Sequence, residues 1–200
     1  FISAAIACSV AFWAEELIVL TLGEDYSAGS ITLCILFFIP LHQSLGQIQG
    51  SFLYATDNAK LLSITGSITL ILGLVGAYLI MATHDAAIPG LHMGSRGLAA
   101  KMIFFQIVNV NVLNFLISSK MGWKIDWAYQ LYSLAVCIVI AGLSSVIVRS
   151  ITEDTIVGVI LNFGVYFFGL GLVVFAFPRV ANMSRSQLKQ YLGHVRLNNR

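Results

Sequence analysis

Long apolar runs separated by short polar segments dominate this sequence, and each run has the length of a membrane-spanning helix. An α-helix rises about 1.5 Å per residue, so about 20 apolar residues cross the hydrocarbon core of a bilayer. The pattern predicts spans over residues 1–14, 31–54, 61–83, 98–118, 128–148 and 155–177. The first is too short to cross alone and reads as a truncated helix. We therefore predict an all-α polytopic membrane bundle of about six transmembrane helices over residues 1–178.

The span over residues 31–54 is apolar in its first half and polar in its second. The polar half carries amides, an imidazole and two glycines spaced by four, at His42, Gln43, Gly46, Gln47, Gln49 and Gly50. Lipid cannot satisfy such side chains, so one face of this helix should meet protein or water. Gln43 and Gln47 are candidates for lining a substrate cavity, and the alternative is hydrogen bonding between helices. Gly46 and Gly50 have the spacing of close helix packing.

The span over residues 98–118 carries a band of amides at membrane depth. Its members are Gln106, Asn109, Asn111 and Asn114. At about 100° per residue they cover more than half of the helix circumference, so some should pair with neighbouring helices. The others are candidates for lining a substrate cavity. A neutral, amide-lined path suits a hydroxyl-rich substrate such as a sugar, because amides both donate and accept hydrogen bonds.

The charged residues are few and unevenly distributed. Hydrophobic residues make up 58% of the chain and charged residues 10%, which does not describe a soluble domain. We expect no nucleic-acid partner. The Lys and Arg residues predicted to lie inside are Lys60, Lys120, Lys124, Arg179, Arg185, Lys189, Arg196 and Arg200. Those predicted outside are Arg96, Lys101 and Arg149. The excess predicts a cytoplasmic C-terminus. The three outer cations either anchor the interface or form a cationic mouth for phosphate or acidic sugars.

The sequence contains no motif of a catalytic, cofactor or metal site. The four histidines lack HExxH spacing, and P-loop, nucleophile-elbow and CxxC patterns are missing from the sequence. Cys8, Cys34 and Cys137 lie in apolar runs and read as small packing residues. We expect no enzyme activity, no catalytic residue, no cofactor and no metal.

Residues 179–200 form a polar, basic tail. Ser184 and Gln187 have the spacing of a capping box. Apolar residues then recur at helical intervals, at Leu188, Tyr191, Leu192 and Val195. The tail is either an amphipathic helix on the inner leaflet or a partly disordered segment whose charges fix the topology.

Residues 12–60 carry a resemblance to a known family. They read FWAEELIVLTLGEDYSAGSITLCILFFIPLHQSLGQIQGSFLYATDNAK, with an L-G-x-x-Y turn at residues 22–26 and an L-x-A-T stretch at 53–56 followed by Lys60. This resembles bacterial polysaccharide and O-antigen flippases of the multidrug/oligosaccharidyl-lipid/polysaccharide exporter superfamily, whose fold is MATE-like. The resemblance implies alternating-access transport of undecaprenyl-pyrophosphate-linked oligosaccharide across the inner membrane.

Two further expectations follow from the resemblance. Such flippases have two lobes, so the chain would be the C-terminal part of a longer protein, working with a missing N-terminal lobe and with membrane lipids. The opening at Phe1, already apolar and without a signal peptide, agrees with that expectation. Two alternatives stay open, a cation-coupled multidrug exporter of the same superfamily and a non-transporting membrane scaffold.

Overall fold

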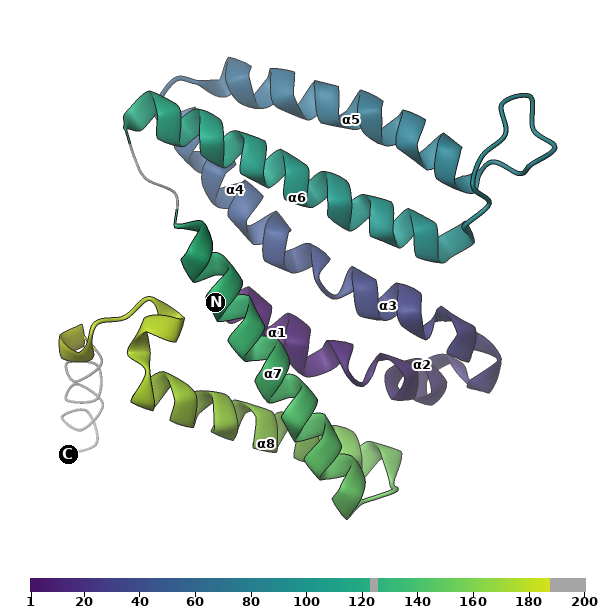
Figure 1. Cartoon of the computed structure of the whole chain (residues 1–200), viewed down its shortest axis with the longest axis vertical. Helices are drawn as coiled ribbons and strands as arrows, with labels where there is room; N and C mark the ends of the chain where they lie inside the picture. Colours follow the sequence, from purple (N-terminus) through teal and green to yellow (C-terminus); the bar gives the residue numbers. More distant parts are fainter. Residues whose placement is uncertain (123–125, 188–200) are drawn as a thin grey trace. The chain divides into compact units, whose positions relative to one another are not determined.

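The computed structural model describes residues 1–122 and 126–187, and all of the secondary structure in these residues is helical (Figure 1). The elements are α1 (Ile2–Ala11), α2 (Ala14–Leu22), η1 (Glu24–Gly29), α3 (Ser30–Leu36), α4 (Ile39–Ala55), α5 (Ala59–Met81), α6 (Gly94–Met121), α7 (Trp127–Ile151), α8 (Thr155–Ala176) and η2 (Pro178–Ala181). Among the described residues, five helical segments are long and apolar enough to cross a membrane, or six if α1 and α2 form one span. The predicted all-α, multi-span fold is confirmed.

The chain divides into two compact units, which we describe separately. One unit comprises Phe1–Phe12 and Asp126–Arg200 and contains α1, α7 and α8. The other comprises Trp13–Ile125 and contains α2 to α6. We call them the α1/α7/α8 unit and the α2–α6 unit.

The helix predicted over residues 31–54 is interrupted at Phe37 and Phe38. α3 ends at Leu36, and α4 starts at Ile39 with Pro40 in its first turn. Proline has no amide hydrogen and its ring clashes with the carbonyl of the preceding turn, so it ends one helix but suits the first turn of the next. Glu24–Ala55 still qualifies as one candidate span by length and composition.

The first predicted helix also ends early. α1 stops at Ala11, before the predicted end at residue 14, and Glu15 and Glu16 lie in the first turn of the next helix, α2. Carboxylates in this position interact favourably with the positive end of the helix dipole. α2 ends at Gly23, whose φ of +98° is rarely adopted by residues with a side chain.

Small side chains pack the α1/α7/α8 unit. On α1 the buried residues include Ala4, Ala7, Cys8 and Ala11, and on α7 they include Ser133, Cys137, Ala141, Ser144 and Val148. Residues of this size allow helix backbones to approach closely in a membrane, where burial of apolar surface drives association weakly. Cys8 and Cys137 are fully buried and unbonded to each other, and Cys34 in the other unit is half-buried.

In the α2–α6 unit, α6 lies alongside α3, α4 and α5 (Figure 1). Its C-terminal half packs into a core in which Leu113 and Ile117 meet Leu53 of α4. Phe52, Leu61 and Leu62 pack against this cluster. α6 is therefore the helix from which polar residues can reach more than one neighbour.

The basic tail begins as predicted. The Ser184 amide donates to Gln187 Oε1 (2.8 Å), and the Gln187 amide donates to Ser184 Oγ (3.2 Å), which is the reciprocal pairing of a capping box. The amphipathic pattern of Leu188, Tyr191, Leu192 and Val195 lies outside the described residues.

Candidate functional site: a groove between α5 and α6

The amides of α6 point to different neighbours. Asn114 accepts a hydrogen bond from Gln49 of α4, whose amide also donates to the carbonyl of Val110 (3.0 Å). Asn111 donates to the carbonyl of Ile107 in its own helix (2.9 Å). Gln106 and Asn109 instead line a groove between α5 and α6. The band that looks continuous in sequence is thus divided between packing and an open surface.

The groove has a volume of about 370 Å³ and combines small residues of α5 with polar residues of α6. Gly66, Thr69 and Gly73 line it from α5, and Lys101, Gln106 and Asn109 line it from α6. The Thr69 hydroxyl donates to Asn109 Oδ1 (3.1 Å). No hydrogen-bond partner for the Asn109 NH₂ group or the Gln106 amide is found among the described residues, so both retain capacity for a ligand.

Lys101 extends into the groove and away from the loop that precedes α6. A Cβ at Gly76 would lie 3.8 Å from Lys101 Cγ, whereas one at Gly73 would lie 3.7 Å from Lys101 Nζ. Since α5 leads into the 82–93 loop, Gly73 is farther from that loop than Gly76. The lysine side chain therefore runs deeper along α5 and does not snorkel toward the loop.

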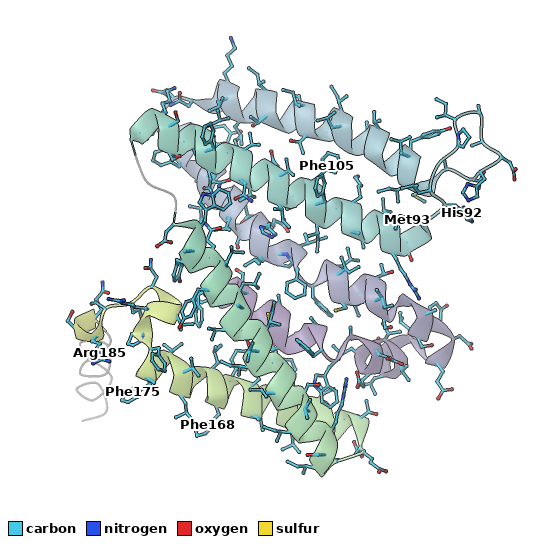
Figure 2. The ribbon with its side chains drawn as sticks, in the orientation of Figure 1. His92, Met93, Phe105, Phe168, Phe175 and Arg185 are labelled. Carbon is cyan, nitrogen blue, oxygen red and sulfur yellow. The ribbon has the colours of Figure 1, made fainter. Side chains whose placement is uncertain are left out.

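An aromatic ring holds the ammonium group in this direction. Lys101 Nζ lies 5.7 Å from the ring centroid of Phe105, a cation–π distance. Phe105 projects from α6 on the side of α5 (Figure 2), and its ring is the nearest group to Gly76. Glycines at 73 and 76 thus leave the space that the lysine stem and the ring occupy.

This arrangement can bind an anion that also carries hydroxyl groups. Lys101 supplies a positive charge, and Gln106, Asn109 and Thr69 supply donors and acceptors within one groove. None of the described residues that line the groove is acidic. A cationic ligand would meet the like charge of Lys101 without a carboxylate to offset it.

The other sequence candidates lie elsewhere. Gln43 and Gln47 are exposed on α4 and are not part of this groove. Gly46 faces Val110 of α6, where a Cβ would lie 3.7 Å from Val110 Cγ2. Gly50 faces Leu62 of α5, with a corresponding distance of 3.6 Å to Leu62 Cδ2. Both glycines therefore lie at helix contacts.

The remaining predicted cations cap backbone groups at span ends. Arg96 in the first turn of α6 donates to the carbonyl of Ala28 (3.4 Å). Arg149 in the last turn of α7 donates to the carbonyl of Phe12 (2.9 Å). Neither lines the groove that contains Lys101.

Two buried amides join neighbouring helices, and neither was predicted from the sequence to do so. Gln49 was visible in the polar cluster of α4 but was not selected, and it bridges α4 to α6. Asn162 on α8 bridges Ser144 of α7 and the carbonyl of Ser9 on α1. The available signal for Asn162 was a single amide in an otherwise apolar span, because such a group needs a protein partner.

Comparison of the chain with protein-family models, with curated proteins and with solved structures finds no match.

Proposed function

We propose that this chain is part of a membrane transporter that moves a lipid-linked oligosaccharide across the bacterial inner membrane by alternating access. The observation that carries the proposal is the groove between α5 and α6, in which Lys101 extends inward beside Gln106 and Asn109. The resemblance of residues 12–60 to polysaccharide flippases supports the same function from an independent part of the chain.

The chemistry of the groove matches the two parts of such a substrate. Sugar hydroxyls pair with amides and with Thr69, since both kinds of group donate and accept. A pyrophosphate linkage pairs with Lys101, because a lysine ammonium is a compact positive charge with three donors. No bond in the substrate has to break, so no catalytic residue is required.

The depth of Lys101 supports a transport role over simple anchoring. Charged side chains within membrane spans are costly and usually face a bundle interior or a wet cavity. An anchoring lysine would direct its ammonium toward the nearest polar loop, and Lys101 does the opposite. The positive charge of Lys101 disfavours an organic cation as the occupant of this groove, because like charges repel.

The test is complementation in the source bacterium with the full-length protein. We expect deletion of the gene to reduce surface polysaccharide and the wild-type gene to restore it. Asn109→Leu and Gln106→Leu, at membrane levels equal to wild type, should each lower restoration about tenfold, because a buried polar site that loses a partner binds its ligand poorly.

Two further measurements distinguish this proposal from a substrate site on α4 and from a multidrug exporter. Gln43→Ala lies on the exposed face of α4, and the groove proposal expects full export with this variant. Export lost in Gln43→Ala and kept in the groove variants would assign the substrate to α4 instead. A deletion strain with normal polysaccharide but raised sensitivity to ethidium would identify a multidrug exporter and refute the flippase function.

A further inference from the structure

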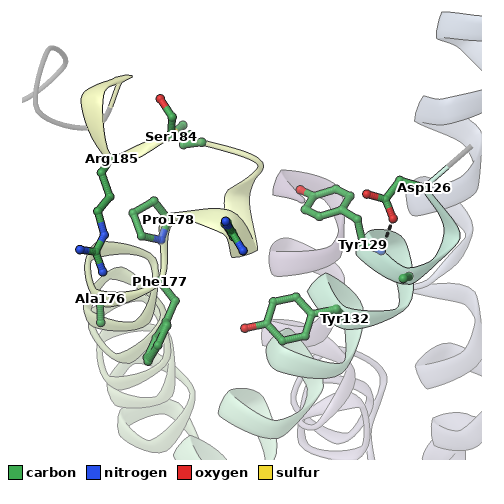
Figure 3. Close-up of a pocket in the computed structure, with 11 residues that line it drawn as sticks. Asp126, Tyr129, Tyr132, Ala176, Phe177, Pro178, Ser184 and Arg185 are labelled. Atoms are coloured by element: carbon green, nitrogen blue, oxygen red, sulfur yellow. Dashed lines mark hydrogen bonds between the residues drawn. The ribbon is translucent and has the colours of Figure 1, made fainter. Parts of the chain in front are cut away.

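A second and larger cavity lies in the α1/α7/α8 unit, where α7 begins and α8 ends. It measures about 850 Å³. Tyr129 and Tyr132 project into it from α7, facing the end of α8 at Phe177 and Pro178, with Arg185 beyond them (Figure 3). Arg179 also lines it. The proposed transport function does not use this cavity.

Hydrogen bonds fix the wall that carries the arginines. The carbonyl of Val180, a fully buried residue, accepts from the Ser133 hydroxyl (3.1 Å) and from the Tyr129 hydroxyl (3.3 Å) of α7. The chain then reverses at Asn182, whose φ is +55°, and the Met183 amide donates to the carbonyl of Pro178 (3.1 Å). η2 is therefore held against α7, and the cavity is built into the fold.

The charged groups that line the cavity differ in their hydrogen bonding and exposure. The carboxylate of Asp126 accepts from the Tyr129 amide (2.9 Å) and caps the N-terminus of α7. Arg185 follows Ser184, which starts the capping box, so its backbone position is set by that box. Arg179 and Arg185 are both exposed and line the cavity with a net positive charge against the single Asp126.

The cavity changes from apolar to polar along its length. Tyr132, Ala176 and Phe177 line it next to the spans. Another cavity of about 540 Å³ shares Asp126, Tyr129, Arg179, Met183 and Ser184 with it, and is lined further by the polar residues Asn182 and Gln187. Because α7 and α8 are both candidate spans, this gradient lies where the helices leave the hydrocarbon core. An amphiphile with an anionic head matches it.

We infer that this cavity binds an anionic phospholipid of the adjoining leaflet, with the headgroup phosphate near Arg179 and Arg185 and the glycerol and upper acyl chain against Tyr132 and Phe177. Guanidinium groups pair with phosphate through several donors, and tyrosines favour the membrane interface. The chain's own residues 188–200 are a poor occupant by charge, since they contain Lys189, Arg196 and Arg200 and no acid.

The experiment is a lipid titration of the delipidated full-length protein followed by native mass spectrometry. Phosphatidylglycerol, phosphatidylcholine and inorganic phosphate are the probes. We expect phosphatidylglycerol to bind more tightly than phosphatidylcholine. The double variant Arg179→Gln/Arg185→Gln should bind it about tenfold more weakly, because charge-assisted hydrogen bonds are roughly twice as strong as neutral ones.

Two variants keep the test informative. Lys60→Gln removes one positive charge at the start of α5, outside the cavity, and should change the affinity less than about twofold, as expected for general attraction to an anionic surface. Tyr132→Leu removes an exposed ring from the cavity without touching the η2 hydrogen bonds, and should weaken binding about threefold.

Three results would overturn the inference. One is unchanged phosphatidylglycerol affinity in the double arginine variant when its thermal stability matches wild type. Another is a loss of affinity in Lys60→Gln as large as that in the double arginine variant, which would show general charge attraction. The third is displacement of the lipid by inorganic phosphate, which would mean that the cavity holds an ion and does not recognise the lipid body.

Discussion

Asn162 on α8 and Asn109 on α6 are both asparagines within candidate membrane spans, and they are used differently. Asn162 is only 1% exposed. Its Oδ1 accepts from the Ser144 hydroxyl (2.9 Å), and its NH₂ donates to the carbonyl of Ser9 (3.3 Å). The amide therefore ties α1, α7 and α8 together and has little capacity left for a ligand.

Asn109 is half-buried and only half-satisfied. Its Oδ1 accepts from Thr69, and its NH₂ group has no hydrogen-bond partner among the described residues. Asn109 also lines the groove between α5 and α6. A charged side chain, Lys101, lies in the same groove. The comparison teaches that polarity at membrane depth does not by itself mark a substrate site. The better criterion is unused hydrogen-bond capacity within a groove that also holds a charged group, which Asn109 meets and the exposed Gln43 and Gln47 do not.

The largest effect that tests this comparison is loss of stability on changing Asn162 to Ala. Two interhelical hydrogen bonds of roughly 1 kcal/mol each disappear, so we expect the free energy of unfolding to fall by about 2 kcal/mol. Denaturant titration of the full-length protein in detergent measures it. Asn111→Ala is the matched control, because Asn111 bonds only within α6, and it should change stability by no more than about 0.5 kcal/mol. Equal losses in both variants would remove the distinction.

A smaller loss is expected for Gln49→Ala in the α2–α6 unit. Gln49 is buried and bridges α4 to Asn114 and Val110, so its removal should cost about 1–2 kcal/mol. Gln47 lies two residues away on the exposed face of α4, and Gln47→Ala should stay within about 0.5 kcal/mol of wild type. The same titration compares them. A large effect of Gln47→Ala would show that its face is covered in the intact protein.

The helices predicted over residues 61–83, 98–118, 128–148 and 155–177 correspond to α5, α6, α7 and α8. About 20 consecutive apolar residues leave few alternatives to a long helix. The sequence analysis did not predict the breaks at Phe37 and at Phe12. The signal for the first was present, since Pro40 cannot continue a helix. The helix predicted over residues 98–118 is longer in the structure, where α6 covers Gly94–Met121. Polar residues at the two ends continue the helix, and the apolar run used to predict the helix does not include them.

The candidate site was only partly accessible from sequence. Asn109 and Asn114 are five residues apart, so about 140° separates them around α6, and they must face different neighbours. Which one faces α4 and which one faces the groove depends on how three helices pack, and periodicity does not contain that information. The inward direction of Lys101 depends likewise on the space left by Gly73 and Gly76, which belong to a different helix, α5.

Lys101 provides a test in which stability and activity should change in opposite directions. Lys101→Met removes a charge that is costly at membrane depth, so we expect the free energy of unfolding to rise by about 1 kcal/mol. Polysaccharide export should fall about tenfold, because the groove loses its only described cation. Lys101→Arg keeps the charge and should retain more export than Lys101→Met. Parallel loss of export and stability in Lys101→Met would indicate a packing role, like that of Asn162.

The smallest effect concerns the glycines that make room for Lys101. Alanine favours a helix over glycine by about 0.5–1 kcal/mol, and Gly66→Ala should gain this because no atom lies within 4 Å of the new Cβ. A Cβ at Gly76 would lie 3.1 Å from Phe105 Cε2, so Gly76→Ala must displace the ring that holds the lysine ammonium. We expect that strain to cancel the gain, leaving Gly76→Ala about 0.5 kcal/mol less stable than Gly66→Ala. Export should fall in Gly76→Ala, since the groove needs Lys101 in its inward direction. Unchanged export with a measurable shift of Phe105 would show that transport tolerates movement of the lysine, and would weaken the groove assignment while leaving the Asn162 contacts untouched.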